Sequence, residues 1–350
     1  MNGQSNFLGK TLVICILLLL ISLNTTPSVA IDSTKNPTYS GNTLYVGGSG
    51  EGNYTKIQDA IDDASDGDTV FVYDESSPYY ENAIVNKSIN LIGENRITTK
   101  INGYSFDIVI DIIADGVLFS CFTVLNCRDS DEGAIIKIRA NSVTINDNAI
   151  RNSNEDGIIL SAVNNINISN NIFMDNHYQN IDIYNSNKIR IMNNTFHGSI
   201  NNCIYSENTN ELVIVGNVFF NPLELAGLDL YLCELSNCLI KRNIFESPNA
   251  GIFLLNCKNC YFTENNFMNE FQYLGFGIVY IYPNNPITNK HKFDNNYWAN
   301  PRTLPKIIIG NFAFSYFGWF YRIIITWGLL IIPIFHFDWH PAKEPYDIEI

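Results

Sequence analysis

The residues best suited to do chemistry are two copies of the pattern Asp-x-Tyr, Asp182 with Tyr184 and Asp229 with Tyr231. A carboxylate can act as a general acid or base or accept hydrogen bonds from hydroxyl groups, and a tyrosine ring can stack against a sugar. Aligned on one outward face, two repeats apart, the two carboxylates are separated by about 9.6 Å. This distance is near the upper limit of the roughly 6.5–9.5 Å gap between the carboxyl groups of inverting glycosidases. The pattern favours a glycan-binding face, a glycan-cleaving face or a plain solvated polar face.

Met174 and His197 are candidate metal ligands. They hold the same slot in adjacent repeats, directly after a closing phenylalanine. Thioether and imidazole ligands suit Cu(I), but two ligands are fewer than a metal site usually has. We therefore expect no cofactor and keep a copper site as an alternative.

Four cysteines hold positions that could bring them together in pairs. Alignment of the repeats puts Cys233 level with Cys257 and Cys238 level with Cys260. Neighbouring parallel strands about 4.8 Å apart fall inside the roughly 4.4–6.8 Å Cα separation that a disulfide needs. The four residues are expected to form paired disulfides or a ladder of core thiols, and four sulfurs could also hold zinc.

A short phrase that recurs six times between residues 143 and 267 positions these residues. Its last apolar residues stand at 150, 173, 196, 219, 245 and 267, so the spacings are 23, 23, 23, 26 and 22. A fixed period of this size predicts stacked units, because one unit cannot bury its apolar face alone. Within each copy the apolar residues alternate, which is the period of a β-strand.

Every copy of the phrase also has an asparagine two places before its last apolar residue. Asparagine tolerates left-handed backbone angles and turns the chain, and stacked copies can hydrogen-bond along the stack. We expect this column to mark a turn in each repeat. Its members are Asn148, Asn171, Asn194, Asn217, Asn243 and Asn265.

The repeats predict an all-β fold, a right-handed parallel β-helix or solenoid with one coil per repeat. Neither the consensus of leucine-rich repeats nor the helices of ankyrin repeats are present. The sequence resembles the pectin-lyase-like superfamily over roughly residues 43–300, and most closely its secreted β-helix proteins of the NosD type. This scaffold carries unrelated activities, so the resemblance implies the fold and no single function. The superfamily's calcium-dependent lyases use an acidic ligand cluster with a basic proton acceptor, and the sequence shows no such cluster.

The N-terminal region is expected to direct export and to close the first coil. Residues 1–30 predict a secretory signal peptide that is cleaved after Ala30, with an uncleaved anchor as the alternative. Residues 31–42 predict a short disordered lead. The predicted solenoid domain, residues 43–300, begins with one strand and an amphipathic helix over about residues 55–65, which is similar to the N-terminal caps of the superfamily.

Residues 301–350 are predicted to form an apolar C-terminal cap or a membrane-associated segment. Between residues 307 and 337, Arg322 divides the apolar stretch into two runs. Each run is shorter than the ~20 residues that cross a bilayer, and a charge near the middle of a span is costly. We prefer a packed cap or a membrane-contacting flap, and a true span is the alternative.

The net charge of −14 at pH 7 argues against nucleic acid and anionic membranes as partners, because both would repel the chain. With the signal peptide, it fits a secreted or cell-surface protein, membrane-associated if residues 307–337 contact a bilayer. We hypothesise a non-catalytic scaffold that binds glycan or another surface component. The alternatives are a polysaccharide-cleaving hydrolase or lyase that uses Asp182 and Asp229, and a NosD-like copper-handling accessory protein.

Overall fold

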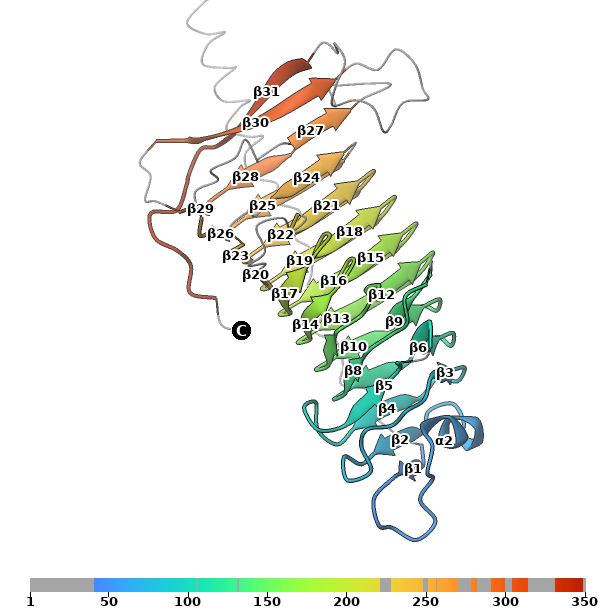
Figure 1. Ribbon diagram of the computed structural model, residues 1–350. Coiled ribbons are helices and arrows are strands. Elements are labelled where there is room, and N and C mark those ends of the chain that lie inside the picture. Colours follow the sequence, from blue (N-terminus) through green and yellow to red (C-terminus); the bar gives the residue numbers. More distant parts are fainter. Residues whose placement is uncertain are drawn as a thin grey trace, which may run out of the picture. The chain divides into compact units, whose positions relative to one another are not determined.

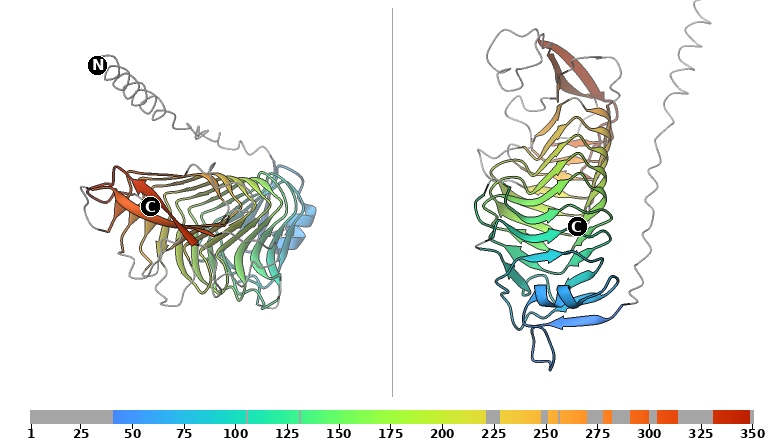
Figure 2. Two further views of the ribbon diagram at one scale, coloured as in Figure 1. Left: turned by 90° about the horizontal axis from the view of Figure 1, so that it is seen from above. Right: turned by 90° about the vertical axis from the view of Figure 1, so that its right-hand side faces the viewer.

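The computed structural model is an all-β parallel solenoid, in which successive coils stack their strands into three sheets (Figures 1 and 2). It describes residues 41–104, 106–130, 132–220, 228–247, 251–255, 257–269, 278–281, 291–299, 304–313 and 331–348. The solenoid confirms the fold class that the repeats predict. The predicted signal peptide and residues 31–40 lie outside the described residues.

Three sheets are formed, which we name A, B and C. Sheet A contains β1 (Thr43–Val46), β2 (Thr69–Val72), β4 (Asn90–Gly93), β7 (Leu118–Ser120), β10 (Thr144–Asn146), β13 (Asn164–Ser169), β16 (Asn187–Met192), β19 (Asn210–Val215), β22 (Ser236–Lys241), β25 (Lys258–Thr263), β28 (Lys292–Asp294), β31 (Ile331–Asp338), β30 (Lys306–Ala313) and β27 (Ile278–Ile281). Sheet B contains β5 (Lys100–Asn102), β8 (Thr123–Leu125), β11 (Ala149–Arg151), β14 (Ile172–Asn176), β17 (Thr195–Ser199), β20 (Val218–Phe220), β23 (Ile244–Phe245), β26 (Asn266–Phe267) and β29 (Tyr297–Trp298). Sheet C contains β3 (Ala83–Val85), β6 (Ile108–Ile112), β9 (Ala134–Ile138), β12 (Asp156–Ser161), β15 (Ile181–Tyr184), β18 (Ile204–Glu207), β21 (Leu230–Cys233) and β24 (Ile252–Leu255).

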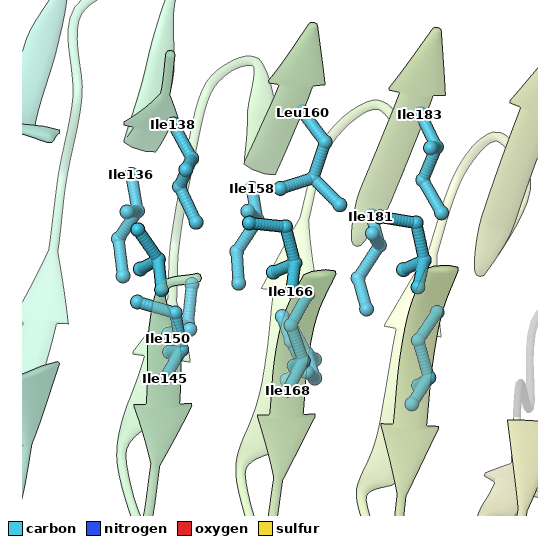
Figure 3. Packing of buried hydrophobic residues seen from close by; sticks show 14 of the residues in the cluster. Ile136, Ile138, Ile145, Ile150, Ile158, Leu160, Ile166, Ile168, Ile181 and Ile183 are labelled. Atoms are coloured by element: carbon cyan, nitrogen blue, oxygen red, sulfur yellow. The ribbon is translucent and has the colours of Figure 1, made fainter. Parts of the chain in front are cut away.

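The solenoid interior is filled by columns of identical or similar side chains from successive coils. Figure 3 shows inward isoleucine and leucine residues of sheet C lying above those of sheets A and B. In sheet A, Ile166 is level with Ile189, and Ile189 is level with Leu212, so the predicted inward ladder is confirmed there. In sheet B, Phe173, Phe196 and Phe219 stack with ring centroids 4.8 and 4.9 Å apart.

The asparagine column is a hydrogen-bonded ladder buried in the turn between sheets A and B. Asn194 shows the pattern: its Nδ2 donates to Oδ1 of Asn217 at 3.0 Å and to the Ile168 carbonyl at 2.9 Å. Its Oδ1 accepts the backbone N–H of Asn171 at 2.8 Å. The left-handed turn residue is the one before each ladder position, as at Asn193 with φ +55°. The expected hydrogen bonds along the stack are therefore present, while the left-handed backbone angle belongs to the preceding residue and not to the ladder asparagine.

Helix α2 (Ile57–Asp63) lies near the first coil, inside the predicted range. Ile57, Ala60 and Ile61 are buried, as the helical period predicts. The helix N-terminus has no side-chain cap of its own. Instead, the Glu81 carboxylate accepts the backbone N–H groups of Ile57 and Gln58 at 2.9 and 3.1 Å.

The C-terminal region adds two strands of sheet A, β30 and β31, which pair antiparallel with each other. Residues 314–330, the centre of the predicted apolar block, lie outside the described residues. Within the described part of the chain, no helix is long and apolar enough to cross a membrane.

Candidate functional site

The outer face of sheet C presents two columns of side chains. Because the residues between them, such as Ile181 and Ile183, are buried in the core, alternate residues of each strand point outward. The first column places Asp182 level with Tyr205, which is level with Tyr231. The first column is Ile159, Asp182, Tyr205, Tyr231 and Phe253, and the second is Ser161, Tyr184, Glu207, Cys233 and Leu255.

Four partly exposed rings on this face form what we call the aromatic platform: Tyr184, Tyr205, Tyr231 and Phe253. The centroids of the Tyr205 and Tyr231 rings are 5.1 Å apart and the rings are stacked. Phe253 lies 4.7 Å beyond Tyr231, and Tyr184 lies 5.7 Å from Tyr205. The platform spans four coils, from β15 to β24, and can offer apolar ring faces to an extended ligand.

Asp182 lies at one end of the platform and is only 4% exposed. The Tyr184 hydroxyl donates to its carboxyl group, while Oδ1 of Asp182 has no hydrogen-bond partner among the described residues. Burial raises the pKa of Asp182 to about 6, against the opposing effect of the Tyr184 hydrogen bond. The face therefore contains a carboxyl group with an unmet acceptor.

Asp156 and Glu207 add two further carboxyl groups. Asp156 Oδ1 accepts the backbone N–H of Gln179 at 2.8 Å. Burial, and next the charge of Asp182, raise the pKa of Asp156 to about 8. Glu207 is partly exposed and accepts a hydrogen bond from the Tyr205 hydroxyl at 2.8 Å. Glu207 is thus fixed between rings of the platform.

Basic side chains are missing from this part of sheet C. Strands β12, β15, β18, β21 and β24 contain no Lys, Arg or His. On the preceding coils the basic residues are neutralised: Lys137 pairs with Glu132 at 2.9 Å, and Arg139 pairs with Asp111. The platform is therefore an acidic and aromatic surface.

Asp229 does not share this face with Asp182, so the predicted pair of carboxylates is wrong. Leu230 is level with Ile204, and Ile204 is level with Ile181, which puts Asp229 one place before the strand. It is 1% exposed, and it accepts a hydrogen bond from the Ser247 hydroxyl at 2.7 Å. Burial raises the pKa of Asp229 to about 7. The shared column from which the gap between these two carboxylates was inferred is therefore absent.

The sequence contains the signal for the correct alignment. The last two spacings of the phrase, 26 and 22, also separate Tyr205 from Tyr231 and Tyr231 from Phe253. Matching the two Asp-x-Tyr patterns to each other ignores these spacings, so it placed Asp229 in the wrong column and left out Tyr205 and Glu207. Of the four predicted binding residues, the structure brings Asp182, Tyr184 and Tyr231 to one face.

Met174 and His197 are level on the outer face of sheet B, as predicted. The His197 ring packs 5.2 Å from the ring of Phe220. Within the described residues, no group of three or more His, Cys, Asp or Glu side chains is arranged to hold a metal ion.

The cysteine alignment is half correct. Cys238 is level with Cys260, as predicted. Cys233 is level with Leu255, so its predicted match with Cys257 is wrong, because Cys257 lies two places further along the chain. The described cysteines are free thiols, and burial raises the pKa values of Cys257 and Cys260, which keeps them protonated. Of the two expected arrangements, paired disulfides or a ladder of core thiols, the described residues have the buried free thiols.

Fold and site together define a parallel β-solenoid with an acidic, aromatic outer face. Comparison with solved structures finds a pectate lyase, Pel9A, at 16% identity over 73% of this chain and 75% of that one, with a TM-score of 0.43. An α-1,3-glucanase from Streptomyces thermodiastaticus is similar at 11% identity over 75% and 64%, with a TM-score of 0.44. The surface adhesin PfbA of Streptococcus pneumoniae is similar at 12% identity over 74% and 84%, with a TM-score of 0.40. These similarities concern the fold alone.

Comparison with models of protein families and with curated protein sequences finds no match.

Proposed function

We propose that the aromatic platform binds a polysaccharide and that the protein is a secreted or cell-surface scaffold. The observation that carries this proposal is the column of partly exposed aromatic rings on the outer face of sheet C, with the partly exposed Glu207 beside it. Ring faces pack against sugar rings, and carboxylate oxygens accept hydrogen bonds from sugar hydroxyls. Because the platform continues over four coils, it suits a chain of sugars better than a single one.

Binding is favoured over cleavage by the positions of the carboxyl groups. Asp229 lies off the platform, so it does not flank the same position as Asp182, which is itself only 4% exposed. A glycan-cleaving site needs two carboxyl groups that flank the same bond. The copper-handling function is not proposed, because no group of three or more His, Cys, Asp or Glu side chains among the described residues is arranged to hold a metal ion.

Cleavage remains a second candidate for one reason. Asp182 and Asp156 are electrostatically coupled, and both have raised pKa values, which suits a general acid. In that case Asp182→Asn abolishes the release of reducing ends while affinity stays nearly unchanged, because the carboxyl group acts on the transition state. Absence of any reducing-end release by the parent protein overturns this candidate.

The proposed function is tested by titrating the purified protein with neutral, acidic and amine-bearing polysaccharides. Tyr205→Ala and Tyr231→Ala are each expected to weaken binding by about 0.5–1.5 kcal/mol, through loss of a stacking contact. Tyr205→Leu and Tyr231→Leu serve as second variants that keep most of the side-chain volume. They should lose affinity in the same way while unfolding at nearly the parent temperature.

Tyr80 and Tyr104 provide matched controls, because they are 71% and 79% exposed and lie outside the platform. Replacing either by alanine should leave binding unchanged. The proposal fails if the parent binds no polysaccharide, or if the Tyr205→Leu/Tyr231→Leu double variant binds as tightly as the parent.

A further inference from the structure

The charge of the platform restricts the glycans that it can hold. Along β12 to β24 the two outward columns carry the carboxyl groups of Asp182 and Glu207 and no basic residue. An acidic polysaccharide laid along these coils would place like charges side by side without a compensating cation. Neutral and positively charged glycans meet no such penalty.

Two features of the face favour a positively charged glycan over a neutral one. Glu207 is a partly exposed carboxylate that is level with Tyr184 and hydrogen-bonded to Tyr205. Aromatic ring faces carry partial negative charge and attract ammonium groups, which are also the natural partners of a carboxylate. A cation over these rings would meet both kinds of attraction at once.

Asp182 is the second, independent feature. It is 4% exposed, it lies in the same column as Tyr205 and Tyr231, and its Oδ1 has no partner within the described residues. A buried carboxyl group with an unmet acceptor projects an uncompensated charge through a medium of low dielectric constant. Within the described strands β12 to β24 no basic side chain screens this charge.

We infer that the platform's ligand is a glycan bearing protonated amino groups, held with its ammonium groups over the tyrosine rings beside Glu207. This inference rests on the proposed function and specifies the class of its ligand. Hydroxyl groups and ring faces of the sugars make the contacts common to all glycans, and the amino groups supply the selectivity.

The test uses oligosaccharides of glucosamine with free amino groups and the same oligosaccharides after N-acetylation. The two ligands share length and hydroxyl groups and differ in charge. The free-amine form should bind about two- to fivefold more tightly, as expected for one cation–π or exposed ion-pair contact. Raising the salt concentration should reduce this preference, because exposed charges are screened.

Glu207→Gln keeps an acceptor for the Tyr205 hydroxyl and removes the charge. It should abolish most of the preference for the free amine and leave the N-acetylated ligand unaffected. The control is Glu211→Gln, which makes the same change on strand β19 of another sheet. It should leave both affinities unchanged. A single carboxylate on another sheet contributes little to the general attraction between a chain of net charge −14 and a polycation.

Each outcome decides the inference. Equal affinities for the two ligands overturn it while the proposed function stands. An equal loss in Glu211→Gln and Glu207→Gln also overturns it, because the attraction is then non-specific. If neither these ligands nor any neutral or acidic polysaccharide binds, the proposed function falls with it.

Discussion

Three carboxyl groups near sheet C are held in surroundings that disfavour their ionised forms. Burial is the leading cause of the raised pKa in each of Asp156, Asp182 and Asp229. A buried carboxylate lacks the water that would stabilise its charge, and few neighbouring donors replace that water. At the scale of single residues, these acids make both the stability of the fold and the charge of the platform depend on pH.

The first prediction is that stability falls as the pH rises from about 4 to about 8. The usual pKa of aspartate is 3.8, and the folded values are about 6 for Asp182, about 7 for Asp229 and about 8 for Asp156. Between these limits the folded state binds more protons than the unfolded state, so the free energy of unfolding decreases with pH. The stability that the three protonated carboxyl groups contribute is fully present below the unfolded pKa, and it is lost as the pH rises through each folded pKa.

Denaturant unfolding at a series of pH values measures this slope. Asp229→Asn keeps an acceptor for the Ser247 hydroxyl, and should flatten the slope and raise stability at pH 8. Asp129→Asn, at an exposed carboxylate, controls for the change in net charge. A slope that is unchanged in Asp229→Asn would show that this residue ionises freely in the folded state.

At the scale of elements, the ladder of asparagines and the stacked phenylalanines join each coil to the next. Every ladder amide in the series from Asn148 to Asn265 donates to the amide oxygen of the next coil. The ladder amides are almost completely buried. Removing one of them therefore leaves its hydrogen-bond partners unpaired and out of reach of water. Each coil is therefore held in register by polar contacts inside an apolar core.

The second prediction concerns Asn194. Asn194→Ala removes the acceptor for the Asn171 backbone N–H and the donor for Asn217. Each unpaired buried group costs about 1–3 kcal/mol, so the melting temperature should fall strongly. Asn193→Gly is the control, because Asn193 is exposed with φ +55° and glycine accepts that conformation. Equal melting temperatures of the two variants would contradict the role of the ladder.

The ladders could be predicted from the sequence because they repeat at a fixed offset within the phrase. The platform could be predicted only in part, since three additional residues between Phe219 and Leu230 shift β21 relative to the pattern that placed Asp229. The helix cap could not be predicted locally, because Glu81 reaches Ile57 and Gln58 from a distant part of the sequence. Contacts between coils depend on the lengths of the turns that join the strands. The residue pattern within a single coil does not reveal these lengths.

At the scale of the whole molecule, the asparagine ladder runs to the end of the coil stack. The last member, Asn296, donates through its backbone N–H and its Nδ2 to Oδ2 of Asp338, both at 3.0 Å. Trp298 Nε1 donates to the same oxygen at 3.0 Å. A carboxylate accepts hydrogen bonds and has none to donate, so Asp338 can end the ladder without leaving a donor unpaired. We propose that this contact is part of the C-terminal cap.

The third prediction tests that proposal. Asp338→Ala removes an acceptor that three N–H donors of Asn296 and Trp298 share, and the last coils should open more often. Hydrogen exchange should therefore become faster at Tyr297, in β29, and stay unchanged in β11. Asp347→Ala, at an exposed carboxylate, is the control. Identical exchange in the two variants would show that Asp338 does not hold the end of the solenoid.

The fourth prediction concerns export. If residues 1–30 are a signal peptide, mass spectrometry of the exported protein should find a chain that begins at Ile31. A membrane-retained chain with its first residues intact would show that the segment is an anchor.

The central claim, that the aromatic platform is where polysaccharide binds, is tested most directly by hydroxyl-radical footprinting of the protein with and without saturating glycan. Tyr184, Tyr205 and Tyr231 are partly exposed and should react in the free protein. Bound glycan should protect these three residues and leave Tyr80 and Tyr104 as reactive as before. Protection of Tyr80 or Tyr104 instead, or equal reactivity of the platform in both states, would contradict the claim.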